Sequence, residues 1–164
     1  MRAYNWLKNR PLSLIMLLFL LLCILNTLLL LLLFGSDPHA GDSVAGMSTT
    51  KKIVYGILIV PFVETLIFQC GVIELGRKFI KSILLILLIS TVLFASSHLY
   101  STYYFFAVLV PCFLLAAFYT IEREKRGVWS AILYTTILHG LVNTFATIWN
   151  YLDSQGNEFT GFFG

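Results

Sequence analysis

The feature that most constrains this chain is a run of about 40 residues, from Ser82 to Ile121, without a single Asp, Glu, Lys or Arg. At 1.5 Å per residue, one helix over this run would be about 60 Å long, twice the thickness of a membrane's hydrocarbon core. The run therefore predicts two membrane-spanning helices that fold back on each other. Tyr100, Ser101 and Thr102 form a polar cluster near its middle and are expected to connect them.

Three further apolar runs are each long enough for a helix of about 20 residues, the length that spans a bilayer. They are Pro11–Phe34, Ile53–Ile73 and Gly127–Leu152, and among Asp, Glu, Lys, Arg and His they contain only Glu64 and His139. The fold class predicted is an all-α, polytopic bundle of about five transmembrane helices. The expected spans are 12–34, 53–74, 82–100, 103–121 and 128–151.

Composition agrees with a membrane protein. Hydrophobic residues make up 59% of the chain and charged residues 12%, whereas soluble domains have about 45–50% apolar and about 25% charged residues. A soluble globular domain and a disordered chain are both excluded. The net charge of +3 does not indicate nucleic-acid binding, because the basic residues form short clusters between the apolar runs.

The basic residues also predict an orientation. If the N-terminus is cytoplasmic, nine of the 11 Lys and Arg lie on the cytoplasmic side, and only Lys51 and Lys52 lie outside. The positive-inside rule then favours N-in/C-out in a membrane, which we expect to be the bacterial cytoplasmic membrane. The expected organisation is an N-terminal tail and first helix (1–34), an external loop (35–52), a four-helix core (53–151) and a polar C-terminal tail (152–164).

Three ionisable side chains lie inside the expected spans, where each costs a few kcal/mol to insert. They are Glu64, His98 and His139. A packing role is open for each, such as a protonated Glu64 bonded between helices. Pro61 precedes Glu64 by one turn, and because proline lacks an N–H we expect it to expose carbonyl groups of the second span.

Polar partners recur at four-residue spacing, which places two side chains on one helical face. The pairs are Thr65 and Gln69, Phe94 and His98, and His139 and Asn143. Gly140 is expected to clear space beside His139.

Smaller polar features have structural interpretations. Asn26 is expected to hold the first span against a neighbouring helix, and Pro111 to kink the fourth span. Two i, i+4 ion pairs are expected at the cytoplasmic interface, Glu74 with Lys78 and Glu122 with Arg126.

Glu64, His98, His139 and Asn143 together suit hydrolysis of an amide bond without a covalent intermediate. A carboxylate can take a proton from water held by one imidazole, while a second imidazole and an amide donate to the developing oxyanion. Alternatively, Glu64, His98 and His139 could bind zinc and activate its bound water. The residues leave both mechanisms open, and neither His-Glu-x-x-His nor Gly-x-Ser-x-Gly occurs.

The same residues, in this order on successive helices, resemble the motifs of the CPBP family, also called the ABI family. This family contains CAAX proteases and bacteriocin-processing enzymes. Its first motif, Glu-Glu-x-x-x-Arg, maps to Glu64, Thr65 and Gln69. Its second, Phe-x-x-x-His, maps to Phe94 and His98, and its third, His-x-x-x-Asn, maps to His139 and Asn143.

The resemblance implies an intramembrane endopeptidase, glutamate-type or zinc-dependent, that cuts a peptide bond in a membrane-associated or lipidated peptide or protein. It implies Glu64 as the base, His98 as the residue that orients water, and His139 and Asn143 as oxyanion donors. Thr65, Gln69 and Phe94 would support them, with Thr65 and Gln69 as a neutral hydrogen-bonding pair. No cofactor is required on this interpretation.

A different class of function is also compatible with the residues. The polar core could serve a catalytically inactive membrane binding or accessory protein that recognises a partner. A proton-relay or transport subunit is less favoured, because no inverted repeat is present.

Overall fold

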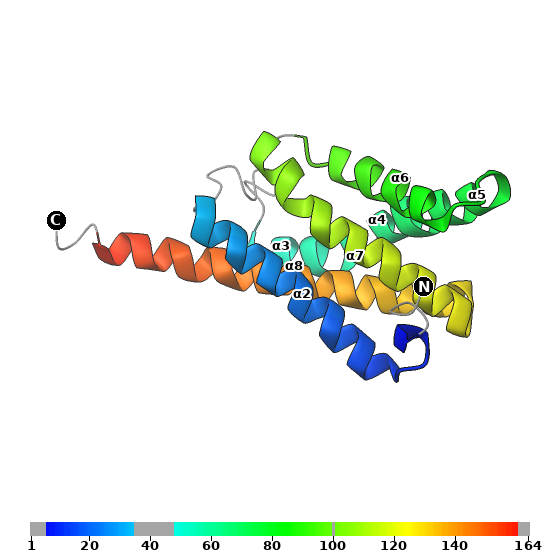
Figure 1. Cartoon of the computed structure of the whole chain (residues 1–164). Coiled ribbons are helices and arrows are strands. Elements are labelled where there is room, and N and C mark those ends of the chain that lie inside the picture. Colours follow the sequence, from blue (N-terminus) through cyan, green and yellow to red (C-terminus); the bar gives the residue numbers. More distant parts are fainter. Residues whose placement is uncertain (1–5, 35–47, 100, 161–164) are drawn as a thin grey trace.

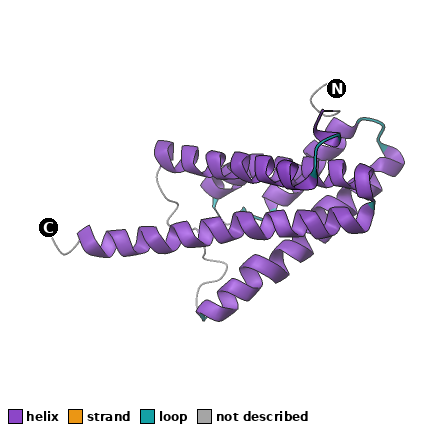
Figure 2. Cartoon of the chain, turned by 90° about the horizontal axis from the view of Figure 1, so that it is seen from below, coloured by secondary structure: helices purple, strands orange, loops and turns teal. Residues whose placement is uncertain are grey.

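The computed structural model describes residues 6–34, 48–99 and 101–160, and its regular structure there consists of helices without strands (Figures 1 and 2). Most of the expected external loop (35–47), Tyr100 and residues 161–164 lie outside the described residues. In chain order the elements are α2 (Leu12–Phe34), α3 (Thr49–Val54), η2 (Tyr55–Ile59), α4 (Val60–Glu64), η3 (Thr65–Gly71), α5 (Val72–Phe79), α6 (Ile83–Ser96), α7 (Thr102–Arg126) and α8 (Val128–Thr160).

Helices occupy all five expected spans, which confirms the polytopic helical bundle. Four stretches are long and apolar enough to cross a membrane: Leu12–Leu33, Tyr55–Phe79, Thr102–Arg126 and Val128–Trp149. The chain is an integral membrane protein. The third expected span differs, because α6 ends at Ser96 and has only 14 residues.

The helix boundaries follow from local capping. The Ser82 side chain accepts a hydrogen bond from the Leu85 N–H at the start of α6, and that of Ser101 accepts one from Tyr104 at the start of α7. The break expected around Ser101 is therefore confirmed. Gly127 separates α7 from α8. Its φ of 89° is a backbone conformation that strains residues with a Cβ, so glycine suits this position.

Three helix boundaries extend beyond the spans expected from the sequence. α7 continues past the expected end at 121 to Arg126, and α8 continues through the expected polar tail to Thr160. α3 also begins at Thr49, inside the expected loop. Polar composition therefore did not mark these helix ends, because a polar segment can extend a helix that is already nucleated.

Helix α7 is the central element of the bundle and packs against α2, α6 and α8 (Figure 1). Its residues Cys112, Leu115 and Phe118 belong to a buried cluster that also includes Phe19 of α2. The rings of Phe19 and Phe118 meet edge to face at 5.5 Å. The first span, outside the expected four-helix core, is thus packed directly onto that core.

The amide of Asn26 confirms the helix contact expected for it. Its Nδ2 donates to the carbonyl oxygen of Ala107 on α7 at 3.2 Å. In a regular helix this carbonyl would receive the N–H of residue 111, and that residue is Pro111. A side chain of α2 therefore satisfies the carbonyl that a proline leaves open in α7.

The ionic end of the bundle differs in part from the expected pairs. Glu74 accepts hydrogen bonds from Arg123 at 2.9 and 3.0 Å and from the Tyr119 hydroxyl, so its partner is Arg123 across the bundle rather than Lys78 on its own helix. The planar guanidinium can bind both carboxylate oxygens of Glu74, which a neighbouring lysine cannot match. The pair of Glu122 with Arg126 is confirmed.

Candidate active site

The second span is not one regular helix where it carries Glu64. It consists of the π-helical segments η2 and η3 with the short helix α4 between them, and Pro61 lies in the first turn of α4. π-Helical segments are frequent at functional sites because they change which groups the backbone leaves unpaired. The disturbance expected around Pro61 is therefore present on both sides of Glu64.

Glu64 and His139 meet across the bundle. The distance between Glu64 Oε2 and His139 Nε2 is 3.6 Å, and the two side chains are 18% and 7% exposed. This is an ion-pair distance that exceeds hydrogen-bond length. Two of the four predicted site residues therefore form one mostly buried cluster. A carboxylate and an imidazole are both costly in lipid without partners, and here each has the other as its partner.

Asn143 binds the backbone opened by Pro61. Its Nδ2 donates to the carbonyl oxygen of Gly56 at 2.8 Å. The Val60 N–H bonds to Tyr55, and the next residue, Pro61, has no N–H to offer. The side-chain amide therefore takes the place of a missing backbone donor. Because this amide nitrogen carries two hydrogens, a second N–H remains for another acceptor.

Gly140 allows this close approach of α8 to the second span. A Cβ at position 140 would lie 2.6 Å from the carbonyl oxygen of Ile57. The sequence assigned Gly140 to clearing space beside His139, whereas the atom that needs the space is this backbone oxygen. Gly140 thereby brings both His139 and Asn143 within reach of the second span.

His98 lies in the turn that follows α6, not within the helix. Its Nδ1 is 3.2 Å from the Phe94 carbonyl oxygen and 3.1 Å from Ser97 Oγ. The Phe94 ring contacts both histidine rings, with centroid distances of 5.6 Å to His98 and 5.5 Å to His139. Phe94 therefore links the two imidazoles that the sequence assigned to one site, and its expected contact with His98 is confirmed.

The short length of α6 predicts that His98 lies inside the membrane rather than at its far surface. Fourteen residues rise about 21 Å, less than the hydrocarbon thickness of about 30 Å, so a helix that starts at the membrane surface ends inside it. Phe68 stacks on Phe94 at 4.9 Å. Glu64 comes four residues before Phe68 on the second span, and His98 comes four residues after Phe94. Because the second span and α6 are antiparallel, both steps run in the same direction, and Glu64 and His98 reach a common level.

Thr65 and Gln69 do not form the expected hydrogen-bonding pair. Both are fully buried on η3. Within the described segments, the Thr65 hydroxyl and both polar atoms of the Gln69 amide have no hydrogen-bond partner. The four-residue spacing places both side chains on the buried side of η3, but lying on one side of a helix does not by itself bring their polar atoms into hydrogen-bond contact.

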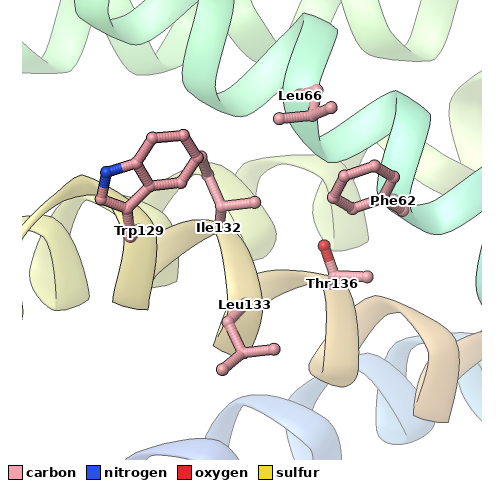
Figure 3. A pocket seen from close by; sticks show the side chains of 6 residues that line it. All are labelled: Phe62, Leu66, Trp129, Ile132, Leu133 and Thr136. Atoms are coloured by element: carbon pink, nitrogen blue, oxygen red, sulfur yellow. The ribbon is translucent and has the colours of Figure 1, made fainter.

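A groove of about 450 Å³ lies beside the site on the same two helices (Figure 3). Phe62, two residues before Glu64, lines it from α4, and Thr136, three residues before His139, lines it from α8. Figure 3 shows the Thr136 hydroxyl between these helices. The lining residues are mostly apolar: Phe62, Leu66, Trp129, Ile132, Leu133 and Thr136. Trp129 is 83% exposed, so the groove opens at the surface.

The zinc alternative needs three ligands at one point. In the part of the chain that the structure describes, no group of three His, Cys, Asp or Glu side chains is placed to hold a metal ion. Glu64, His98 and His139 thus do not form a ready ligand set in this arrangement.

Sequence reasoning missed two features of the site. Thr135 is fully buried one turn before His139, and its four-residue spacing from His139 was a signal that could have revealed it. The groove residues gave no such signal, because Ile132 and Leu133 have the same character as lipid-facing residues elsewhere in the chain. Only the packing of α4 against α8 distinguishes them.

Comparison with known families supports the resemblance drawn from the motifs. The family model for the Rce1-like type II CAAX prenyl endopeptidases matches residues 47–145, which include every predicted site residue. Comparison with curated proteins and with solved structures gives no match. At the level of the family, the activity is that of a CAAX-type intramembrane endopeptidase, which acts on a peptide or protein in a lipid environment. The chain belongs to the Rce1-like family of type II CAAX prenyl endopeptidases.

Proposed function

We propose that the chain hydrolyses a peptide bond in a membrane-associated or lipidated peptide or protein, with Glu64 as the general base. The observation that carries this proposal is the contact of Glu64 with His139, 3.6 Å apart in a mostly buried cluster. A carboxylate in this position can take a proton from water as that water attacks a peptide carbonyl, and can deliver the proton to the departing amine.

The other site residues have roles that fit their surroundings. His98, linked to His139 through Phe94, orients the attacking water. His139 and the second amide N–H of Asn143 donate hydrogen bonds to the oxyanion. A zinc-dependent mechanism is the alternative, and it requires His98 and Glu64 to move into one ligand set.

A lipid-anchored substrate fits the environment of the site. The groove beside it is apolar, of about 450 Å³, and open at the surface. An acyl or isoprenoid chain can lie there while the attached peptide reaches Glu64. The N-in/C-out orientation in a bacterial cytoplasmic membrane remains part of the proposal, supported by the basic residues at one end of the bundle.

The test is cleavage of a fluorogenic peptide that carries a farnesylated cysteine near its C-terminus, by the full chain in proteoliposomes. Glu64→Gln preserves shape but removes the base, so we expect turnover to fall by at least about a hundredfold with folding unchanged. Glu124→Gln, at the ionic end of the bundle, is the matched control and should retain turnover.

Three outcomes separate the alternatives. Undiminished cleavage by folded Glu64→Gln protein would refute the assignment of the base. Loss of folding in that variant would favour a structural role for Glu64. Binding of the farnesylated peptide without cleavage by the native chain would favour the accessory-protein alternative, for which the use of the Asn143 amide in helix packing is the supporting observation.

A further inference from the structure

Two buried polar pairs lie on neighbouring helices next to the proposed site. Thr65 and Gln69 lie on η3, and Thr135 and His139 lie at the same spacing on α8. The two helices are in contact. We call these four residues the polar column.

The register of the column is fixed at both ends. At one end, Glu64 contacts His139. At the other end, Ile73 and Ala131 belong to one buried cluster, and they lie four residues beyond Gln69 and four residues before Thr135. Gln69 and Thr135 therefore occupy a common level, between the site and this apolar cluster.

The column is buried but its polar atoms are unsatisfied. Thr65, Gln69 and Thr135 are 0% exposed and His139 is 6% exposed. Among the described residues, no hydrogen-bond partner exists for the two threonine hydroxyls, for either polar atom of the Gln69 amide or for His139 Nδ1. Such concentration is unusual, because proteins satisfy the large majority of buried polar atoms.

These atoms match the requirements of bound water. A buried water makes two to four hydrogen bonds and needs both donors and acceptors. The hydroxyls and the amide offer both, so they can accommodate a water in any orientation. Hydrolysis also consumes one water for each peptide bond, and the surrounding lipid does not supply it.

We propose that the polar column binds ordered water that holds the His139 ring through Nδ1 and replenishes the water used at Glu64. This inference rests on the proposed function for its catalytic part. Thr135 and Gln69 are then positioning residues, which act on the reaction through water and His139 rather than by touching substrate.

Direct contact with water can be measured in lipid bilayers without any substrate. Gln69 and Gln155 are the only glutamines in the chain, so labelling glutamine side chains with ¹⁵N gives two signals, which the Gln69→Met variant assigns. In water-edited solid-state NMR, we expect rapid transfer of magnetisation from water to the Gln69 side-chain amide. The same transfer should be slower in the Thr135→Val variant. A Gln69 amide that receives no magnetisation from water would overturn the proposal, whether or not the chain proves to be a protease.

Turnover of the farnesylated peptide provides the second measurement. Thr135→Val replaces the hydroxyl by a methyl group. We expect kcat to fall about tenfold with KM unchanged, as for other residues that orient a reacting side chain without touching the substrate. Thr135→Ser, which restores the hydroxyl, should recover kcat. Thr91→Val is the matched control, since the Thr91 hydroxyl is buried and satisfied within its own helix.

Stability distinguishes this role from a packing role. A fall in kcat at a temperature where Thr135→Val remains fully folded does not come from unfolding, so it supports the water site. Unchanged kcat in Thr135→Val would overturn the catalytic part, and so would a fall in kcat that Thr135→Ser does not reverse.

Discussion

The Asn143 amide donates to the carbonyl oxygen of Gly56 at 2.8 Å, the carbonyl left without a backbone donor because residue 61 is proline. Asn26 and Ala107 repeat this arrangement at Pro111. In lipid, no water is present to satisfy an open carbonyl, so a side chain from a neighbouring helix does so. Pro61 and Pro111 therefore each create a specific docking point for another helix, and Pro61 lies one turn from Glu64.

The coupling of Asn143 to Pro61 can be tested by a double-mutant cycle. Asn143→Leu should lower the free energy of unfolding by about 1–3 kcal/mol, because it leaves the Gly56 carbonyl unsatisfied. Pro61→Ala supplies a backbone N–H, so the same substitution should cost less in that background. Unfolding in mixed detergent micelles measures all four proteins, and identical costs in both backgrounds would contradict the relationship.

The equivalent prediction for the first span concerns Asn26. Asn26→Leu should destabilise the protein by about 1 kcal/mol and weaken the docking of α2 on α7, and this cost should disappear when Pro111 is replaced by alanine. Thr27→Val is the control, because the Thr27 hydroxyl donates to the Cys23 carbonyl oxygen on its own helix. A cost that persists in the Pro111→Ala background would show that Asn26 acts by some other contact.

Gly140 and Gly56 give opposite predictions for the same substitution. Gly140→Ala places a Cβ 2.6 Å from the Ile57 carbonyl oxygen, so α8 has to move away from the second span and separate His139 from Glu64. We expect turnover to fall more than tenfold. Gly56→Ala meets no atom within 4 Å and should be tolerated. Equal effects of the two substitutions on peptide cleavage would argue against close helix approach as the reason for Gly140.

Metal dependence has a separate test. Since the described side chains provide no group of three ligands for a metal ion, we expect prolonged treatment with a strong chelator to leave peptide cleavage within about twofold of the untreated enzyme. The measurement is turnover together with the metal content of the purified protein. Activity that is lost on chelation and restored by stoichiometric zinc would establish the zinc alternative.

Much of the fold followed from the sequence. The uncharged run from Ser82 to Ile121 predicted two helices with a break near Ser101, because a single helix would be too long for a membrane. The structure has that break. The early end of α6 could not be predicted, since Ser97 is no more polar than Ser90 inside the helix.

The site followed from the sequence only in part. Spacing placed His139 and Asn143 on one face, and both do contact the second span. Spacing placed Thr65 and Gln69 together on the buried side of η3 but did not make them a hydrogen-bonding pair, because a shared face does not fix the direction of the polar atoms. The partner of Glu74 was also missed, since Arg123 lies on a different helix.

The sequence by itself determined that the chain crosses a membrane as several helices, because transferring charged groups into lipid costs energy wherever the chain folds. It also determined which few polar residues required a partner there. Tertiary structure alone decided which groups are those partners. They are the Gly56 carbonyl for Asn143, the Ala107 carbonyl for Asn26 and the Glu64 carboxylate for His139. These contacts join helices far apart in the chain, and their choice depends on helix register and close packing, which no local pattern encodes.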